Sequence, residues 1–325
     1  MAQQNAAAQD SQSAFAEMAV NWNRERKVDL VCEGGGVLGI ALVGAYSVLE
    51  ERGYHPQNLV GTSAGAVVAT LIAAGYGGNQ IHDIIFSDLN VNLLDSQWEE
   101  RLPLLGQTLI AKGLAILWQE GLYKGDRFLE NMRNYLDQAP QRSIKTFRDL
   151  IYDASAAANS PYRYKVQVIV SDLTGRSLLR LPMDAETAFG VSPDDVPVAE
   201  AVRMSMSIPF FFEPVHRRNE QSKEEHVLVD GGMLSNYPVW FFDTDDSQGL
   251  PAWPTFGLKL VAPSQRTDFA QSLPVPLRGD AGRLVNFIYS LVDTMLEAHD
   301  RLAFDTDTFV RTIAIPIGDV DAHNF

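Results

Sequence analysis

The chain has 325 residues, of which 46% are hydrophobic and 21% charged, a balance that excludes a disordered or fibrous protein. It carries 41 acidic and 26 basic residues, and the net charge of −15 argues against nucleic-acid binding and against permanent electrostatic docking on anionic lipid. The single cysteine, Cys32, excludes an intramolecular disulfide and a cysteine-rich metal site.

Residues 1–26 are expected to form an N-terminal arm, either disordered or a short helix, ahead of one domain that spans residues 27–325. Phe15, Met18 and Trp22 recur at helical spacing in this arm. Packing or a frayed terminus is the simpler interpretation, and a membrane or partner anchor is the alternative. The sequence contains neither a recognisable signal peptide nor an apolar run of about 18 residues, which predicts a cytoplasmic protein. Export by a route that needs no signal peptide stays open.

Two strand–helix units are predicted at the start of the domain. Lys27–Cys32 is short, apolar and followed by three glycines, which is typical of a buried strand, and Val37–Arg52 has the period of a helix. A second strand is expected at Leu59–Thr62 and a second helix at Ala64–Ala74, and a glycine follows each helix. Strands and helices that alternate at this spacing predict parallel strands with crossover connections.

A mostly helical insertion is expected over about residues 79–150, with Asn79 and Asp126 as N-caps. Further elements are expected in the second half of the chain. These are strands at Tyr164–Ser171, Ser177–Leu181, Val227–Asp230, Phe256–Val261 and Val310–Ile317, and a helix at Leu284–Ala298. This order predicts the α/β class, as a three-layer domain with a mostly parallel central sheet and a helical insertion.

The pentapeptide Gly61-Thr-Ser63-Ala-Gly65 stands between a predicted strand and a predicted helix. Gly-x-Ser-x-Gly in this context indicates a nucleophile elbow, because small residues permit a cramped turn that lifts the serine hydroxyl clear of the sheet. The helix that begins at Ala64 directs the positive end of its dipole at the serine, which favours developing negative charge. Because small-residue turns are common, a turn without chemistry is the alternative.

A second strand-to-helix turn has the sequence Glu33-Gly34-Gly35-Gly36-Val37-Leu38-Gly39. Consecutive glycines expose backbone N–H groups, as an oxyanion hole or a phosphate cradle requires. The same glycines fit the dinucleotide-binding pattern Gly-x-Gly-x-x-Gly, which also requires an acidic residue at the end of the second strand. That strand leads into Gly61-Thr-Ser63 instead, and the nucleotide interpretation is therefore disfavoured.

A third turn, Asp230-Gly231-Gly232, follows the apolar strand Val227-Leu-Val229. Taken alone, it is as consistent with a simple turn as with chemistry. Together with the segment Ser205-Met-Ser207-Ile-Pro209 and the two turns above, in this order and spacing, it resembles the patatin-like phospholipase family. The resemblance is strong over residues 28–75 and 199–238, and looser over residues 28–261.

The resemblance implies a patatin-like sandwich and a lipid acyl hydrolase of the phospholipase A or lysophospholipase type. Ser63 would attack the ester carbonyl with Asp230 as its base partner, and water would then release the fatty acid from an acyl-enzyme. The implied oxyanion hole is Gly34, Gly35 and Gly36, and the implied supporting glycines are Gly39, Gly61, Gly65, Gly231 and Gly232. The implied partners are a phospholipid or other acyl-lipid substrate and a membrane surface met transiently, and no metal or other cofactor is implied.

Three features bear on the details of the site. Many family members carry Arg or Lys where this chain has Leu38. The leucine supplies no positive charge to bind an anionic head group. The chain order Ser63, Asp230, His299 also suits an α/β-hydrolase triad, although His299 stands near a predicted helix terminus, where its charge would suit the dipole. Asp243-Thr-Asp245-Asp246 lacks the rest of an EF-hand pattern and is interpreted as a solvated loop.

Two apolar stretches are candidates for an acyl groove or a lid, with core packing as the alternative for each residue. Their members are Met204, Met206, Ile208, Phe210, Phe211 and Phe212, and, in the insertion, Trp98, Leu102, Leu105, Leu109, Leu117 and Trp118. Two alternatives to a phospholipase remain. One is a non-phospholipid carboxylesterase or thioesterase with the same dyad, and the other is a catalytically silent lipid-binding or signalling module. The head group, a regulatory partner and the oligomeric state stay open.

Overall fold

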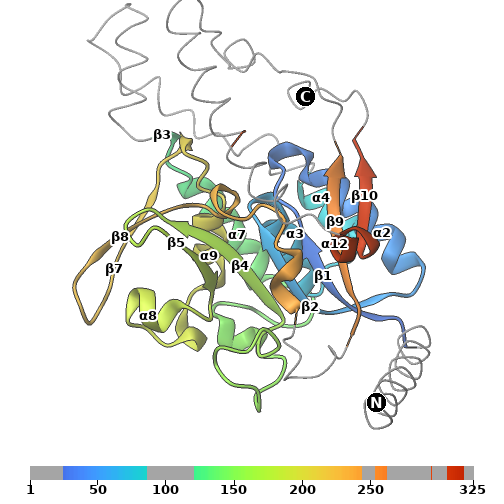
Figure 1. Cartoon of the computed structure of the whole chain (residues 1–325), viewed down its shortest axis with the longest axis horizontal. Helices are drawn as coiled ribbons and strands as arrows, with labels where there is room; N and C mark the ends of the chain where they lie inside the picture. Colours follow the sequence, from blue (N-terminus) through green and yellow to red (C-terminus); the bar gives the residue numbers. More distant parts are fainter. Residues whose placement is uncertain (1–24, 86–120, 244–252, 262–293, 295–305, 318–325) are drawn as a thin grey trace, which may run out of the picture.

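The computed structural model describes residues 25–85, 121–243, 253–261, 294 and 306–317, and the fold is described for these residues. Its large sheet has eight strands. They are β1 (Lys27–Cys32), β2 (His55–Thr62), β4 (Val166–Asp172), β5 (Ser177–Leu181), β7 (Val215–Arg218), β8 (Glu225–Asp230), β9 (Thr255–Val261) and β10 (Thr312–Pro316). Figure 1 shows this sheet at the centre of the molecule, in the order β10-β9-β1-β2-β4-β8-β7, with β5 paired to β4.

The sheet is mostly parallel. β1 pairs in parallel with β2 and with β9, β10 pairs in parallel with β9, and β2 pairs in parallel with β4. β8 runs antiparallel to both β4 and β7, and β5 runs antiparallel to β4. All seven residues of β4 are buried, as expected for a central strand that is covered on both faces. The α/β class with a mostly parallel sheet is therefore confirmed.

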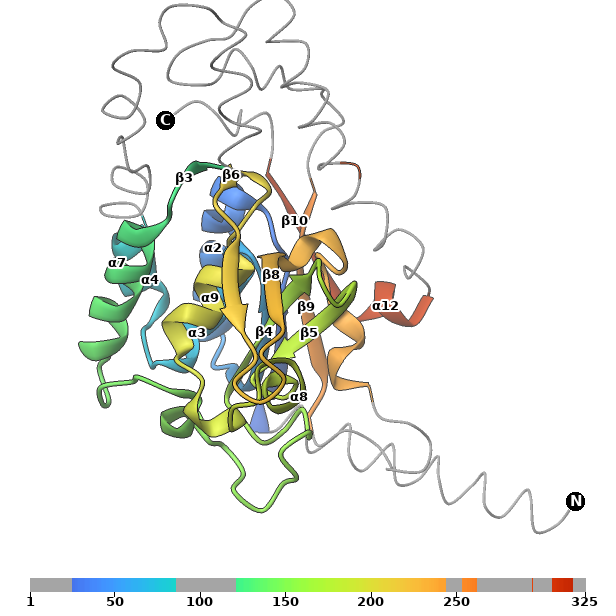
Figure 2. The same ribbon diagram turned by 90° about the vertical axis from the view of Figure 1, so that its left-hand side faces the viewer.

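A layer of helices covers one face of the sheet. It contains α2 (Ile40–Glu51), α3 (Ala64–Ala73), α4 (Gly78–Ile84), α7 (Asp126–Asp137) and α9 (Val198–Ser205). Figure 2 shows these helices together on one side of the strands. Nine of the ten residues of α3 are buried, because this helix lies directly on β1, β2 and β4. A helix that is apolar on all sides belongs in such a central position.

The opposite face is covered mainly by short turns within the described residues. After β8 the chain forms two 3-10 helices, η6 (Gly231–Met233) and η7 (Val239–Phe242). Side chains of this segment pack on the sheet in a second apolar cluster. The cluster contains Val31, Val60, Ile169, Met183, Tyr237, Val239, Phe241 and Phe242. Two faces packed against apolar side chains give the layered sandwich in which one covering layer is made largely of turns.

The remaining elements connect these layers. They are η1 (Gly36–Gly39), β3 (Gly121–Tyr123), η4 (Phe147–Leu150), α8 (Ala185–Phe189), η5 (Pro193–Asp195), β6 (Phe210–Phe212) and α12 (Thr306–Val310). β3 and β6 form a small parallel sheet of their own. No helix of the described chain is long and apolar enough to cross a membrane.

Several predicted boundaries differ from the structure. The helix expected at Val37–Arg52 begins as the 3-10 turn η1 and becomes α-helical only at Ile40. Asn79 and Asp126 lie inside helices rather than at their caps, because Gly77 and Gly125 occupy the N-cap positions. The insertion also contains the strand β3, so its described part is not uniformly helical.

Other predictions lie outside the described residues. These are the N-terminal arm up to residue 24, the Trp98–Trp118 stretch and the helix Leu284–Ala298, of which only residue 294 is described.

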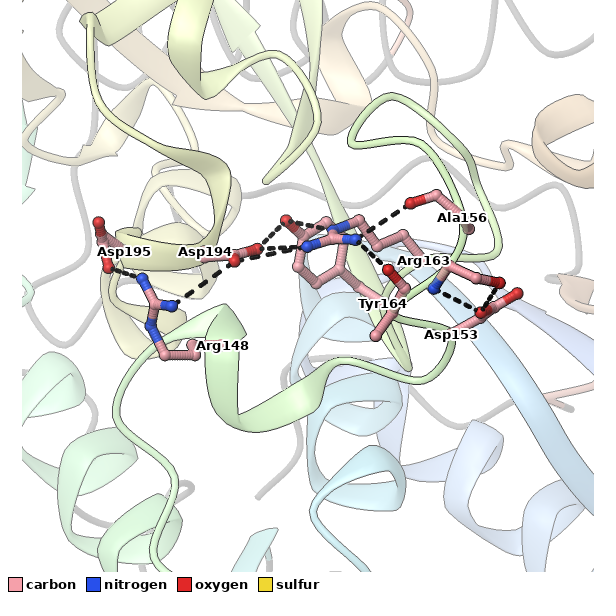
Figure 3. A network of polar contacts seen from close by, with 9 residues as sticks. Arg148, Asp153, Ala156, Arg163, Tyr164, Asp194 and Asp195 are labelled. Atoms are coloured by element: carbon pink, nitrogen blue, oxygen red, sulfur yellow. Dashed lines mark hydrogen bonds and ion pairs between the residues drawn. The ribbon is translucent and has the colours of Figure 1, made fainter.

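A network of polar contacts connects the residues just before β4 with η5, the short helix that precedes α9. Figure 3 shows Asp194 between two arginines, with its Oδ1 atom 3.4 Å from Nη2 of Arg163 and its Oδ2 atom 3.8 Å from Nη1 of Arg148. The hydroxyl of the fully buried Tyr164 donates to Oδ1 of Asp194 at 2.5 Å. The network lies at the start of β4, whereas the residues singled out in the sequence lie toward its other end.

Candidate active site

Ser63 occupies a tight turn between β2 and α3. Its backbone angles, φ 53° and ψ −127°, are unfavourable for a residue with a side chain, which is the strained geometry of a nucleophile elbow. The turn is close-packed: a side chain at Gly61 would collide with the Gly65 carbonyl, and one at Gly65 would collide with the carbonyls of Cys32 and Glu33. The small residues of the pentapeptide are therefore required by the approach of α3 to β1 and β2.

Asp230 reaches the same region from the opposite direction along the sheet. Thr62 of β2 lies opposite Ile169 of β4, and the next residue of β4, Val170, lies opposite Asp230 of β8. Ser63 follows Thr62, so the serine and the aspartate leave their strands at the same level with β4 between them. Two strand spacings separate their backbones by about 10 Å, a gap that side chains pointing toward each other can bridge.

Burial controls the carboxyl group of Asp230. The residue is 1% exposed, and desolvation raises its pKa from 3.8 to about 7. The Ser63 side chain and the N–H of Gly232, which donates to Oδ1 at 2.8 Å, lower the pKa by smaller amounts. Within the described chain, Oδ2 of Asp230 has no hydrogen-bond partner. A buried, unpartnered oxygen on a group that titrates near neutrality is suited to accept a proton.

The Ser63 hydroxyl lies near this carboxyl without a formed hydrogen bond to it. Its proximity is sufficient to lower the pKa of Asp230, but Oγ of Ser63 is directed at Sδ of Met206, 3.7 Å away. Catalytic hydrogen bonds are often long in ligand-free structures and shorten only when substrate is bound.

The glycine-rich turn lies beside the elbow because β1 and β2 are adjacent parallel strands whose carboxyl ends meet at one edge. A methyl group added at Gly34 would lie 3.2 Å from Cβ of Ser63 and would collide with the Asn236 side chain. Asn236 holds Gly34 on both sides: its carbonyl accepts from Gly34 N at 3.0 Å, and its Nδ2 donates to the Gly34 carbonyl at 3.1 Å. No described residue accepts a hydrogen bond from the N–H of Gly35 or of Gly36.

The other glycines of the motifs pack around these turns. Gly36 has φ 53°, a backbone conformation that favours glycine, and a Cβ there would meet no atom within 4 Å. Gly39 closes η1 against Ala64, and Gly231 passes over the Ile169 carbonyl. The glycines of the three motifs thus lie close to Ser63 and Asp230 in the structure.

A cation at the glycine turn was not anticipated from the sequence. Nζ of Lys259, on β9, lies 2.5 Å from Oε1 of Glu33, the residue that precedes Gly34. Leu38 carries no charge, but Lys259 from β9 reaches the same turn and forms an ion pair with Glu33 there. Asn236 was likewise missed, because no local pattern links it to Gly34, from which it is separated by 202 residues.

Histidine has a different place in this structure. His226 is buried, and its Nδ1 lies 2.7 Å from Oδ2 of Asp172 rather than next to Ser63. His299, the alternative triad member, lies outside the described residues, as do Asp245 and Asp246. Asp243 forms an ion pair with Arg311.

The apolar stretch proposed as an acyl groove is half core: Ile208, Phe210 and Phe211 are partly exposed, and the other three members are buried. Met204 is 1% exposed, Met206 is 8% exposed, and Phe212 is 4% exposed and lies under the guanidinium group of Arg203. Within the described residues of this group, Met206 contacts Ser63, with its sulfur 3.7 Å from the serine hydroxyl oxygen. A groove at Ser63 therefore stays a prediction for the other members, and the Trp98–Trp118 stretch lies outside the described residues.

Comparison with known proteins places the chain in a family. The family model of patatin-like phospholipases matches residues 30–243, and the chain belongs to this family. It is 35% identical over 298 residues to the uncharacterized protein YqhO of Bacillus subtilis (strain 168), with 92% of this chain and 90% of YqhO covered. The uncharacterized protein R571 of Acanthamoeba polyphaga mimivirus is 25% identical, with 90% of this chain and 83% of R571 covered.

Solved structures with a similar arrangement include two bacterial proteins. VipD from Legionella pneumophila is 20% identical with a TM-score of 0.46, and 92% of this chain matches 62% of VipD. The type III effector ExoU of Pseudomonas aeruginosa is 17% identical with a TM-score of 0.42, and 90% of this chain matches 48% of ExoU. The chain therefore spans less than two thirds of the length of either protein.

Proposed function

We propose that this protein is a lipid acyl hydrolase that cleaves carboxyl esters of membrane lipids, with Ser63 as nucleophile and Asp230 as general base. The observation that carries the proposal is the pairing of a strained serine with a buried carboxyl that has one unpartnered oxygen and a pKa of about 7. Membership of the patatin-like phospholipase family supports a lipid substrate. We further propose that the protein works in the cytoplasm and meets the membrane transiently.

In the proposed reaction, Oδ2 of Asp230 accepts the Ser63 proton while Oγ attacks the ester carbonyl carbon. The carbonyl π electrons move to the oxygen, and collapse of the tetrahedral intermediate expels the lipid alcohol, which takes the proton from Asp230. Water, deprotonated by the same carboxylate, then attacks the acyl-enzyme, and Ser63 regains its proton as the fatty acid leaves. A base with a pKa of about 7 can give and take this proton near neutral pH.

The oxyanion hole is assigned to the N–H groups of Gly35 and Gly36. Gly34 was included in the expectation, but its N–H already donates to the Asn236 carbonyl, so its contribution would be to hold the turn in place. Backbone donors fixed in advance stabilise the developing negative charge without reorganisation at the moment of reaction. The positive N-terminal end of α3, which begins at Ala64, acts in the same direction.

The test compares intact protein with Ser63→Ala and Asp230→Asn on phospholipid vesicles, with lipidomic analysis of the products. We expect free fatty acid and lysophospholipid with the intact protein and a loss of at least about 1000-fold with Ser63→Ala, as for removal of a covalent nucleophile. Asn219→Ala serves as the matched control, because this buried side chain binds the β7–β8 turn and lies outside the site. Undiminished hydrolysis by Ser63→Ala would refute the dyad.

The same experiment separates the alternative activities. A soluble short-chain ester and an acyl thioester are supplied beside the vesicles. Turnover of these substrates alone, abolished by Ser63→Ala, would assign a carboxylesterase or thioesterase. Absence of turnover on all three substrates, with correctly folded protein, would favour a silent lipid-binding module.

A further inference from the structure

The segment Ser205-Met-Ser207 joins the end of α9 to the turn before β6, and the reaction proposed above uses none of its hydroxyls. Ser205 is fully buried. Its Oγ accepts a hydrogen bond from the backbone N–H of Ser63 at 2.8 Å and donates one to the Ile169 carbonyl of β4 at 2.7 Å. One hydroxyl therefore links the backbone of the elbow to the strand that separates Ser63 from Asp230.

Ser207 makes the matching contact on the other side. Its carbonyl accepts from the backbone N–H of Asp230 at 2.9 Å. Its own side chain is fixed by Arg203, whose Nη1 donates to Oγ at 2.5 Å and whose carbonyl accepts from the same Oγ at 2.9 Å. Arg203 is in turn buried and donates to the carbonyls of Lys124 and Glu213, which fixes the end of α9 against two neighbouring turns.

We infer that Ser205–Ser207, here called the brace, sets the separation of the nucleophile and its base, and that Ser205 is a positioning residue for the reaction. The inference rests on the proposed function. The brace contacts the backbone of Ser63 through a side chain, the backbone of Asp230 through a carbonyl, and the Ser63 hydroxyl through Met206. Three consecutive residues thus touch both members of the dyad.

Strain at the elbow explains why a brace is needed. A non-glycine residue at φ 53° persists only where surrounding contacts determine it, because relaxation toward negative φ lowers its energy. The hydrogen bond from Ser63 N to Ser205 opposes that relaxation at the strained residue itself. Serine is suited to the position because one hydroxyl accepts from Ser63 and donates to Ile169 at the same time. Alanine can do neither, and the thiol of cysteine does both weakly.

The experiment uses Ser205→Ala and Ser205→Cys in the full chain, with Asn219→Ala as a control that loses buried hydrogen bonds far from the dyad. Turnover of a soluble short-chain ester is measured so that vesicle binding does not contribute. We expect kcat of Ser205→Ala to fall about 10–100-fold, since a buried donor is left unpaired at the nucleophile, while KM stays within about twofold. The kcat of Ser205→Cys should lie between those of the wild type and Ser205→Ala, and Asn219→Ala should keep the kcat of the wild type.

Two further measurements distinguish positioning from a general loss of stability. The rate at which a fluorophosphonate labels Ser63 should fall in parallel with kcat. The midpoint of the pH–rate profile should move upward, because a Ser63 hydroxyl that withdraws from the carboxyl no longer lowers the pKa of Asp230. A kcat loss in Asn219→Ala as large as in Ser205→Ala would mean that destabilisation alone explains the effect, and would overturn the inference.

The outcomes separate this inference from the proposed function. Folded Ser205→Ala with unchanged kcat and labelling rate overturns the brace but leaves the dyad intact. If Ser205→Ala fails to fold, Ser205→Cys decides, and an unchanged kcat in that variant overturns the brace. Retained hydrolysis by Ser63→Ala overturns the proposed function itself, whatever Ser205 does.

Discussion

The carboxyl of Asp230 has a pKa of about 7 because it is buried, and a general base acts only when it is ionised. We therefore expect kcat/KM for an uncharged soluble ester to rise about tenfold per pH unit below pH 7 and to level off above it. A pH series with a short-chain ester, corrected for protein stability, measures this profile. A rate that is independent of pH through neutrality would contradict the role of Asp230 as base.

The same raised pKa makes a stability prediction. The folded-state pKa of Asp230 lies above the value of about 3.9 in an unfolded chain, so its favourable contribution is complete below that value and is lost as pH rises through about 7. Asp230→Asn cannot ionise. Its free energy of unfolding should therefore increase relative to the wild type between about pH 4 and pH 7, by about 1 kcal/mol or more, and the difference should level off above pH 7.

Urea denaturation at several pH values measures this difference. Asp29, whose pKa is also raised to about 7 by burial, is present in both proteins, so its contribution cancels. A difference that stays constant with pH would mean that Asp230 is not destabilising when charged.

Backbone strain at Ser63 separates two substitutions that both remove the proposed nucleophile. Glycine adopts φ 53° without a Cβ penalty, whereas alanine retains the penalty. Ser63→Gly should therefore be more stable than Ser63→Ala by about 1 kcal/mol, while both lose ester hydrolysis. Thermal unfolding of the two variants tests this order, and equal stabilities would show that the elbow carries no strain.

At the scale of elements, the network in Figure 3 offers a comparison of two neighbouring carboxylates. Asp194 accepts from the buried Tyr164, whereas Asp195 forms only an exposed pair with Arg148. Asp194→Ala should cost about 1–3 kcal/mol, because it removes the acceptor of a buried hydroxyl. Asp195→Ala should cost less than about 1 kcal/mol.

Chemical denaturation of both variants tests this contrast, with ester turnover expected to stay unchanged because the network lies at the start of β4. Equal losses of stability in the two variants would show that the buried hydrogen bond from Tyr164 to Asp194 adds no stability beyond that of an exposed ion pair.

For the whole molecule, the net charge of −15 governs the approach to a membrane. Binding to zwitterionic vesicles must then depend on apolar burial, worth about 25 cal/mol per Å², and should change little with added salt. On anionic vesicles the repulsion is screened by salt, so binding should increase with ionic strength. Vesicle sedimentation over a salt series measures both. Loss of zwitterionic binding in salt would instead reveal a local basic patch.

Much of the sheet and the two turns of the candidate site could be predicted from local patterns. β1, β2 and α3 were foreseen because short apolar runs end in glycines, and Ser63 and Asp230 were selected because each stands in a small-residue turn after a strand. The predicted N-caps of α4 and α7 were wrong, and for α7 the reason lies in a contact that no local sequence pattern contains. Gly125 begins α7 in a left-handed conformation under the Arg203 guanidinium, and that contact joins residues far apart in the chain.

The sequence alone determined the composition of the site, because an elbow, a glycine turn and an aspartate turn are each encoded within a few residues. The tertiary structure decided how these turns are held. Ser205 meets Ser63 across 142 residues and Asn236 meets Gly34 across 202, and neither pairing leaves a local signature. A serine or an asparagine has the same letter in the sequence whether its side chain faces solvent or supports a strained turn. The register of β2, β4 and β8 places Ser63 and Asp230 at one level, and α9 and the segment after η6 carry Ser205 and Asn236 to the two turns.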